Sequence, residues 1–387
     1  MAQPRRALIA LGLGASLAAS APRAVGAQTA PEVVLVTMGP GDDVFSRFGH
    51  AALCVRDPAD PAGRCYNYGT ADFSTPGPLT WAVLRGRGRF WVSEAPEAWM
   101  VQRYGPDEDR DVWVQALPLP PAARTELARR LAWDALPAHR HFVYHHYRDN
   151  CTTRLRDHID AVSHGALRRV GGRPFGQTWR TPTRQGFATA PALLAVSDLA
   201  LGRALDRPMS TWEAMFLPEV LRAEVRRALD GRPEARWRRQ AQVPPGDPSA
   251  GQRIVASLAG LLGALSAALS WRVGPPGRRW ARGALGGLLG AAGAALWGLA
   301  AVSALPELRI NECLLFLTPT DFYLGVADEA KAARYARARV AGALGVLGLW
   351  AAGILMQPLG WVGALVIAAL VPWAMPWGRA VPPARRP

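Results

Sequence analysis

Four long apolar runs in the second half of the chain constrain its fold more than any other feature. They cover residues 254–271, 283–304, 340–356 and 359–377. A helix that crosses the hydrocarbon core of a bilayer needs about 20 predominantly apolar residues, and each run approaches that length. The last two runs are short or interrupted by proline, so two firm spans with a looser C-terminal hairpin are the cautious interpretation. We predict an α-helical transmembrane region of about four spans over residues 254–377, followed by a tail at 378–387.

The N-terminus has the pattern of a secretory signal peptide, which we assign to residues 1–27. A basic start precedes an apolar stretch over residues 7–19, and residues 25–27 (VGA) supply the small side chains of a cleavage site. An uncleaved anchor is the alternative. Both interpretations place Gln28 and the residues after it outside the cytoplasm.

The charges beside the apolar runs agree with this orientation in one place and less well in another. The loop RVGPPGRRWAR between the first two runs has four arginines and no acidic residue, so the positive-inside rule places it in the cytoplasm. Arg334, Arg337 and Arg339 precede the third run. The same topology leaves these three outside, where the rule does not expect them.

The formal net charge of +15 invites a nucleic-acid interpretation. However, Lys331 is the only lysine, so the charge belongs to a chain generally rich in arginine, alanine, glycine and proline. Anionic lipid headgroups are the expected counter-charge for an exported, membrane-bound protein. We predict a membrane partner and no nucleic-acid partner.

The exported part, residues 28–241, changes from strand-like to helix-like patterns along its length. Runs such as HAALCVRD and RCYNYGT alternate or are apolar and end in turn residues, whereas CTTRLRDHIDAVS and STWEAMFLPEVLRAEVRRALDG have apolar residues at helical spacing. Ser210 and Glu213 have the spacing of a capping box, which predicts the start of one last long helix. Strands followed by helices predict an α+β domain, joined by a linker at 242–253 to the membrane region.

The exported part contains three of the four cysteines. Cys54 and Cys65 flank the turn-rich segment VRDPADPAGR, so pairing of the adjoining runs as a hairpin would face them across two strands. Disulfides persist in oxidising compartments. We expect this pair to form one and to leave Cys151 as the free thiol of the domain.

Cys151 lies at the predicted start of a helix, in the stretch YHHYRDNCTTRLRDHID. Asp149 or Asn150 is a suitable N-cap, which would put the thiol in the first turn, where the helix dipole and a cationic partner lower its pKa. Backbone N–H groups of that turn can also stabilise an oxyanion. The alternative is a buried structural cysteine on an amphipathic helix.

A base for this thiol has several candidates among the seven histidines. His145 and His146 are near in sequence, whereas His50 opens an apolar strand in FSRFGHAALCV. A zinc site is a further alternative, because four histidines cluster with Cys151: His139, His141, His145 and His146. His141 and His145 have the HxxxH spacing, but the glutamate of an HExxH motif is not between them. We predict no bound metal and no cofactor.

Several stretches together resemble the N-terminal periplasmic domain of the Lnb-type lipoprotein N-acyltransferases. They are VTMGPGDDVFSRFGHAALCV, YNYGTADF, LRGRGRFW, YHHYRDNCTTRLRD and LDRPMSTWEAMFLP, which follow one another over residues 36–218. A membrane-spanning region follows in such proteins as it does here. One difference is the outer loop SALPELRINECLLFLTPTDF, which lacks the histidine of the family pattern.

The resemblance implies a permuted papain-like (NlpC/P60-like) thiol fold in which His50 is the base and Cys151 the nucleophile. By triad logic a third polar group orients the imidazole, and Asn67 on the next strand is our candidate. The implied reaction moves an acyl chain from a phospholipid through a thioester to the N-terminal amine of an apolipoprotein. The implied location is the bacterial inner membrane, with the catalytic domain in the periplasm.

We also predict substrate contacts from Arg148, Arg154 and Tyr68, the arginines through phosphate headgroups. Ion pairs with neighbouring aspartates are the alternative for these arginines. The apolar set Trp212, Met215, Phe216 and Leu217 suits a core helix better than an interfacial lid. The alternative functions are an envelope cysteine amidase or peptidase and a non-catalytic envelope scaffold.

Overall fold

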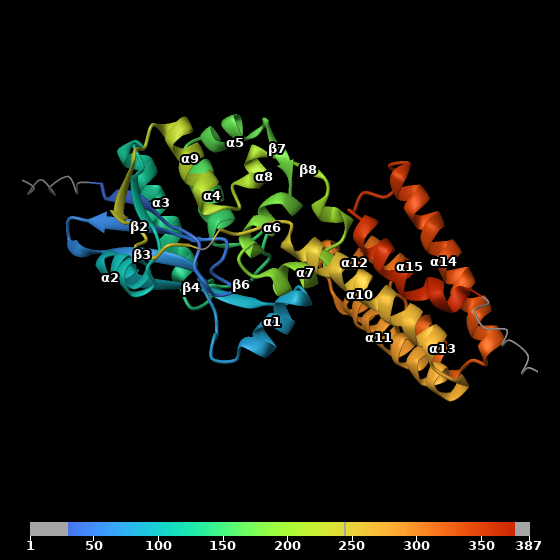
Figure 1. Ribbon diagram of the computed structural model, residues 1–387. Coiled ribbons are helices and arrows are strands. Elements are labelled where there is room, and N and C mark those ends of the chain that lie inside the picture. The colour runs from blue at the N-terminus through green and yellow to red at the C-terminus, as the bar shows by residue number, and fades with distance from the viewer. Residues whose placement is uncertain (1–29, 244, 376–387) are drawn as a thin grey trace, which may run out of the picture.

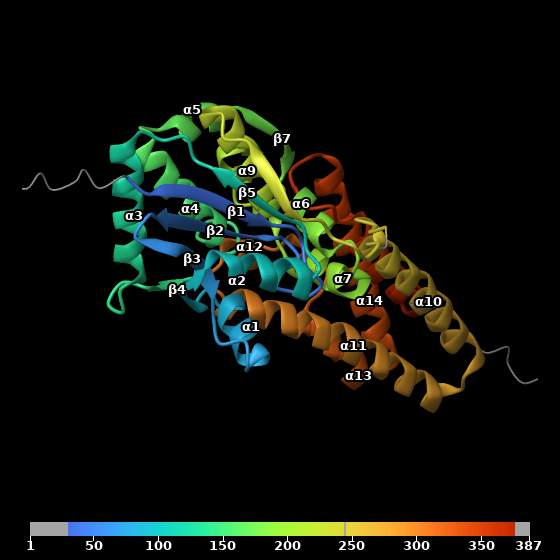
Figure 2. The same cartoon turned by 90° about the vertical axis from the view of Figure 1, so that its left-hand side faces the viewer.

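The computed structural model describes residues 30–243 and 245–375 of the chain (Figure 1). The predicted signal peptide and the predicted tail lie outside these residues. The described part consists of a domain built on a β-sheet and a bundle of helices that extends from one end of that domain (Figures 1 and 2).

The domain is organised around a seven-stranded sheet of order β6-β4-β3-β2-β1-β5-β9, in which every neighbouring pair is antiparallel. Its strands are β1 (Glu32–Met38), β2 (His50–Asp57), β3 (Asp60–Thr70), β4 (Arg89–Pro96), β5 (Val112–Ala116), β6 (His141–Val143) and β9 (Pro233–Trp237). A second, two-stranded sheet pairs β7 (Pro174–Thr178) with β8 (Pro208–Ser210). The predicted α+β class is confirmed.

Short helices connect and cover the strands. They are α1 (Pro76–Leu84), α2 (Glu97–Gln102), the π-helical turn η1 (Arg103–Asp107), α3 (Pro121–Ala135), α4 (Cys151–Val162), α5 (Ala166–Gly171), α6 (Arg180–Phe187), α7 (Pro191–Ala200), the 3₁₀ turn η2 (Arg203–Leu205), α8 (Thr211–Ala214) and α9 (Pro218–Leu229).

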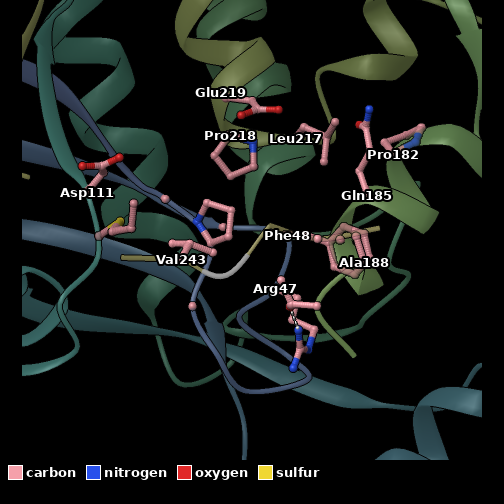
Figure 3. A pocket seen from close by; sticks show the side chains of 18 of the residues that line it. Arg47, Phe48, Asp111, Pro182, Gln185, Ala188, Leu217, Pro218, Glu219 and Val243 are labelled. Carbon is pink, nitrogen blue, oxygen red and sulfur yellow. Dashed lines mark hydrogen bonds between the residues drawn. The ribbon is translucent and has the colours of Figure 1, made fainter. Parts of the chain in front are cut away.

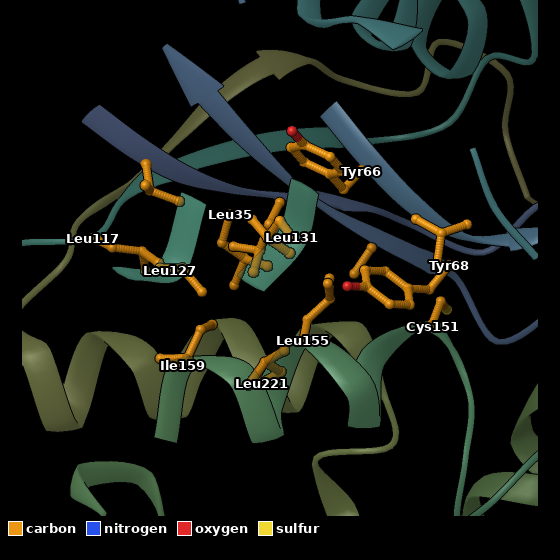
Figure 4. Packing of buried hydrophobic residues seen from close by; sticks show 14 of the residues in the cluster. Leu35, Tyr66, Tyr68, Leu117, Leu127, Leu131, Cys151, Leu155, Ile159 and Leu221 are labelled. Atoms are coloured by element: carbon orange, nitrogen blue, oxygen red, sulfur yellow. The ribbon is translucent and has the colours of Figure 1, made fainter. Parts of the chain in front are cut away.

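The main core lies between the sheet and helices α3, α4 and α9 (Figure 4). Leu131 of α3, Leu155 of α4 and Leu221 of α9 are fully buried against sheet residues such as Leu35. Burial of a leucine side chain contributes roughly 1.5–3 kcal/mol, so this layer fixes α4 firmly on the sheet. The start of α4 is thereby held at one end of strand β2.

The predicted disulfide between Cys54 and Cys65 is confirmed. The two cysteines are directly opposite each other in the β2–β3 pair. They lie on the opposite face of the sheet from α4, in a second core with Met100 of α2. The hairpin interpretation of this segment was therefore correct.

The last helix of the domain differs from its prediction. The capping box of Ser210 and Glu213 forms, but the helix that it starts, α8, ends at Ala214, and α9 begins separately at Pro218. Proline is tolerated in the first turn of a helix but not in its interior, so the chain restarts there. Met215 and Phe216 in the break are fully buried, as expected for core residues rather than a lid.

Strands β6 and β9 were not predicted. β6 has three residues, and β9 reads PEARW, with proline and two charged side chains. Both are edge strands of the sheet, where one free side relaxes the demand for apolar alternation. Local patterns were too weak to show them.

Two helices of the described residues are long and apolar enough to cross a membrane: α10 (Ala250–Arg272) and α11 (Pro275–Val302). Two further helices cover the other predicted spans, α14 (Glu329–Ala351) and α15 (Gly360–Ala374). The first half of α14 is rich in charged residues, and α15 has only 15 residues. The prediction of about four spans is therefore supported for two of them.

Between α11 and α14 the chain forms α12 (Pro306–Arg309), two 3₁₀ turns, η3 (Glu312–Leu315) and η4 (Pro319–Phe322), and α13 (Tyr323–Val326). This segment runs back along α11. Glycines of α11 allow the close approach, since a Cβ at Gly286 would lie 2.6 Å from the Asp321 carbonyl oxygen and one at Gly290 would lie 2.8 Å from the Phe322 ring. The segment returns to the start of α11, where Arg278 forms an ion pair with Glu329 at 2.7 Å.

Because the segment returns along α11, the basic residues before the third apolar run lie at a different end of the bundle from the one that we predicted. Arg334, Arg337 and Arg339 lie in the first half of α14, which starts beside the α10–α11 connection. They therefore belong to the same end of the bundle as the arginine-rich loop RVGPPGRRWAR. The expectation that these arginines lie at the outer end assumed that the segment between α11 and α14 stays at one end, whereas the structure places the start of α14 beside the α10–α11 connection.

Candidate active site

Three residues from different elements meet at one end of the sheet. His50 is the first residue of β2, Asn67 lies in β3, and Cys151 is the first residue of α4. Nε2 of His50 is 2.7 Å from Oδ1 of Asn67, and the His50 ring hydrogen-bonds the Cys151 thiol. The structure thus brings together the three residues that we predicted as a catalytic set.

The hydrogen bonds around Asn67 determine how the His50 ring is protonated. Oδ1 of Asn67 also accepts the backbone N–H of Gly69 at 3.0 Å, and an N–H group can only donate. The Asn67 oxygen therefore faces His50, so Nε2 of the neutral ring carries the proton. Nδ1 is left as the acceptor for the Cys151 thiol.

Asn150 holds the first turn of α4. Its side-chain oxygen accepts the N–H groups of Thr152 and Thr153, and the Thr153 hydroxyl accepts the Asn150 N–H in return. The Asn150 side-chain nitrogen donates to the carbonyls of His146 and Phe216. The cap therefore ties the helix start to the preceding loop and to the chain before α9, which limits the movement of Cys151.

The electrostatics of this position favour a thiolate. Burial by itself raises the pKa of the Cys151 thiol, but the charge and hydrogen bond of His50 lower it, with help from the Thr152 hydroxyl and the Ala51 backbone N–H. The net result is a pKa of about 7. The Cys151 side chain is only 6% exposed, so the thiolate is formed in a site that largely excludes water.

Two residues that sequence reasoning missed complete the surroundings of His50. A Cβ at Gly69 would lie 2.5 Å from Cε1 of His50, so only glycine leaves room for the ring. The Tyr104 ring is 5.6 Å from the His50 ring between centroids, and its hydroxyl hydrogen-bonds the Asn67 side chain. The glycine in YNYGT is the only local sign of this packing, and Tyr104 has none.

The predicted substrate contacts have partners inside the protein. Nη2 of Arg148 is 2.9 Å from Oε1 of Glu307 in α12, and Nε of Arg154 is 2.6 Å from Oδ1 of Asp149. The Tyr68 hydroxyl donates to Asp134 at 2.9 Å in a fully buried position. Substrate binding by these three residues stays a prediction, and the ion-pair alternative describes the arginines as they lie here.

The other histidines do not converge on Cys151. His146 is buried among aromatic rings, and burial lowers its pKa to about 4. His141 lies on β6 opposite Trp91, and His158 bonds to Asp134. Within residues 30–243 and 245–375 no group of three or more histidine, cysteine or acidic side chains could hold a metal ion.

Glu307 is a further residue that the sequence did not mark. It lies in the loop segment between α11 and α14, yet its carboxylate contacts Arg148 and also His145, with Oε2 3.5 Å from Nε2 of the ring. Burial raises the pKa of Glu307, but the nearby His145 ring and the hydrogen bonds from Arg148 lower it to about 2 overall. This carboxylate connects the helix bundle to the loop that precedes Cys151.

The chain matches a known protein family over a range that contains all three residues of the candidate site. Residues 23–185 match the family model described as the Lnb N-terminal periplasmic domain, a range that includes His50, Asn67 and Cys151. No curated protein and no solved structure matches the chain. The family predicted from the sequence motifs is confirmed by this match: residues 23–185 of the chain are similar to the Lnb N-terminal periplasmic domain family.

Proposed function

We propose that this protein is a membrane-bound thiol acyltransferase that moves an acyl chain from a phospholipid to the N-terminal amine of an apolipoprotein. The observation that carries the proposal is the hydrogen-bonded series Asn67, His50 and Cys151, within a domain of the Lnb family. In this interpretation Cys151 is the nucleophile, His50 the base and Asn67 the residue that orients the imidazole. The order of histidine before cysteine is that of a permuted papain-like domain.

The first half-reaction forms a thioester. The Cys151 thiolate attacks the carbonyl carbon of an acyl ester, a C–S bond forms, and the C–O bond to the glycerol oxygen breaks. His50 supplies the proton that the leaving oxygen needs, so lysophospholipid departs as an alcohol. Because Asn150 occupies the N–H groups of Thr152 and Thr153, the Cys151 N–H is the donor of this turn that we assign to the oxyanion.

The second half-reaction transfers the acyl chain to an amine. The N-terminal amine of a lipidated cysteine attacks the thioester carbonyl, a C–N bond forms and the C–S bond breaks. His50 takes the proton that the amine loses, and Cys151 leaves as the thiolate that began the cycle. Both substrates are anchored in the outer leaflet, which fits a domain that precedes α10 and α11 directly. The site is accordingly assigned to the periplasmic side of the inner membrane.

Intact-mass analysis of the purified full-length protein after incubation with phospholipid vesicles tests this proposal. The wild type should gain a fatty-acyl mass that neutral hydroxylamine removes, and Cys151→Ser and His50→Ala should not gain it. A diacylated lipopeptide with a free amine should then discharge the wild-type adduct and become triacylated. Absence of the adduct in folded, membrane-inserted wild type would contradict the acyltransferase and favour the cysteine amidase.

A further inference from the structure

A cavity of about 490 Å³ lies beside the candidate active site (Figure 3). Its walls come from the β1–β2 loop, the α6–α7 turn, the start of α9 and the linker that leads to α10. Gly49, the residue before His50, is part of the wall, and so is Phe48, whose ring lies 4.3 Å from the His146 ring between centroids. The lining includes Gly49 but not His50, Asn67 or Cys151, so a ligand in this cavity would contact the chain next to the proposed base rather than the base itself.

Three arginines line the cavity: Arg47, Arg222 and Arg239. Arg47 donates to the Thr189 hydroxyl at 2.7 Å, and Arg222 donates to the Thr37 hydroxyl at 3.0 Å while it lies 4.7 Å from the Trp113 ring centroid. Within the described part of the chain, neither Arg47 nor Arg222 forms an ion pair with a carboxylate. The Nε atoms of Arg47 and Arg239 are also buried without a hydrogen-bond partner there.

These guanidinium groups differ from those of Arg148 and Arg154. The latter two pair at 2.9 and 2.6 Å with Glu307 and Asp149, so their charge is already compensated. A guanidinium held by a hydroxyl or an aromatic ring keeps its charge available for an anion, and arginine binds phosphate with two parallel hydrogen bonds. The cavity therefore provides the phosphate-binding chemistry that Arg148 and Arg154 do not.

The same cavity contains negative charge. Asp42, Asp111 and Glu219 also line it, and Asp42 pairs with Arg239 at 3.0 Å. Figure 3 shows Asp111 and Glu219 at the cavity on the side away from Arg47. Arg222 lies three residues after Glu219 on α9, and the charges of Glu219 and Asp111 act on it, so Arg47 is the arginine on the side away from these carboxylates. A pocket lined by both guanidinium groups and carboxylates is complementary to a ligand that carries both an anion and a cation.

The position of the cavity relative to the bundle adds a second argument. Gly246 and Pro248 of its wall lie directly before α10, which starts at Ala250. α10 is one of the two helices long enough to cross a membrane, so its first residues mark the level of the lipid headgroups. The cavity wall thus includes both Gly49, next to His50, and Gly246 and Pro248, next to the start of α10.

We propose that this cavity binds the zwitterionic headgroup of a glycerophospholipid, with the phosphate at Arg47 and Arg222 and the ammonium group facing Asp111 and Glu219. The inference deepens the proposed function and rests on it, because the headgroup would belong to the acyl donor. Arg47 and Arg222 are then substrate-binding residues, and a donor with a phosphate and an ammonium group is preferred over one with a phosphate alone.

The test uses glycerophosphoethanolamine, which has the headgroup but no acyl chain, and full-length protein in an uncharged detergent. Calorimetric titration of Cys151→Ser protein should show binding, and Arg47→Gln/Arg222→Gln in the same background should weaken it at least tenfold. Inorganic phosphate and glycerophosphoglycerol should bind more weakly than glycerophosphoethanolamine. Arg129→Gln is the matched control, since Arg129 is an exposed arginine of α3 that pairs with Glu126. The affinity of this variant should equal that of the parent.

Arg222→Lys distinguishes loss of charge from loss of folding, because it keeps the cation and should retain most of the binding. Equal affinity of the parent and the double variant, or no binding by the folded parent, would overturn the headgroup site. The acyltransferase proposal has a separate readout. If the acyl adduct forms at the wild-type rate in the double variant, the acyltransferase proposal holds and the headgroup site is not needed for the reaction. If the headgroup binds but the wild type forms no adduct, the binding site is real and the proposed reaction is wrong.

Discussion

Nε2 of His50 and Oδ1 of Asn67 lie 2.7 Å apart, and the same Asn67 oxygen accepts the Gly69 N–H. This double acceptance fixes the orientation of the amide and leaves Nδ1 of His50 directed to Cys151. The carboxamide of Asn67 therefore orients the imidazole ring through a hydrogen bond and adds no charge beside it.

Asn67→Ala should slow thioester formation by about 10- to 100-fold, since misplacement of a reacting group by about 1 Å costs rates of this order. Single-turnover intact-mass measurements with phospholipid vesicles give the rate. Asn67→Gln is the comparison that keeps the amide but moves it, and it should fall between wild type and alanine. A wild-type rate in Asn67→Ala would show that the hydrogen bond has no orienting role.

The Cys151 thiol should react as a thiolate with a pKa of about 7. The rate of iodoacetamide alkylation should rise with pH and reach half its maximum near that value. In His50→Ala the stabilising charge is lost while burial remains, so the midpoint should move to higher pH. An unchanged midpoint in the variant would contradict the pairing of the thiol with His50.

Gly69→Ala should impair catalysis without unfolding the domain. The added Cβ would lie 2.5 Å from Cε1 of His50, so the ring must move away from Cys151 or Asn67. We expect a rate loss of about 100-fold by the same misplacement argument. Gly77→Ala is the control, because a Cβ at Gly77 meets nothing within 4 Å. Equal rates for the two variants would remove the steric role of Gly69.

Removal of the disulfide should destabilise the domain. Cys54 and Cys65 are 11 residues apart, and closing a loop of that size stabilises a fold by about 2–3 kcal/mol. Cys54→Ala/Cys65→Ala should therefore unfold at a lower denaturant concentration than oxidised wild type. Reduced wild type should behave like the variant, and a midpoint equal to that of the oxidised protein would contradict a stabilising role.

Glu307 should stabilise the contact between the bundle and the domain in a pH-dependent way. Its folded-state pKa of about 2 is below the ordinary 4.5, so the stabilisation is complete above pH 4.5 and is lost as the pH falls towards 2. Glu307→Gln should lose about 2 kcal/mol at pH 6, and the difference from wild type should shrink at pH 3.

The control for Glu307 is Glu329→Gln, which removes a carboxylate that is 63% exposed and pairs with Arg278 at the far end of the bundle. Exposed ion pairs contribute about 0–1 kcal/mol, so its effect should be small at both pH values. Equal losses of unfolding free energy in the two variants would show that the buried Glu307 contact stabilises the protein no more than an exposed ion pair does.

Local patterns determined much of this protein. The alternation of HAALCVRD and RCYNYGT predicted the paired strands β2 and β3 and hence the Cys54–Cys65 bond, because hairpin pairing depends on neighbouring residues. Asn150 before Cys151 predicted the cap of α4, since capping acts within one turn. The family motifs likewise identified the domain over residues 23–185.

Tertiary structure decided what local patterns do not contain. The path of the segment between α11 and α14 depends on its packing along α11 at Gly286 and Gly290. The order of the apolar runs alone placed the following arginines at the other end of the bundle from where they lie. The pairing of Arg148 with Glu307 joins residues 159 positions apart, and the approach of Arg47 and Arg222 to one cavity spans a similar distance along the chain. Such contacts result from the packing of whole helices and strands, which local sequence patterns do not contain. Residue types could suggest His50, Asn67 and Cys151 as a set, but only the folded chain brings them within hydrogen-bonding distance.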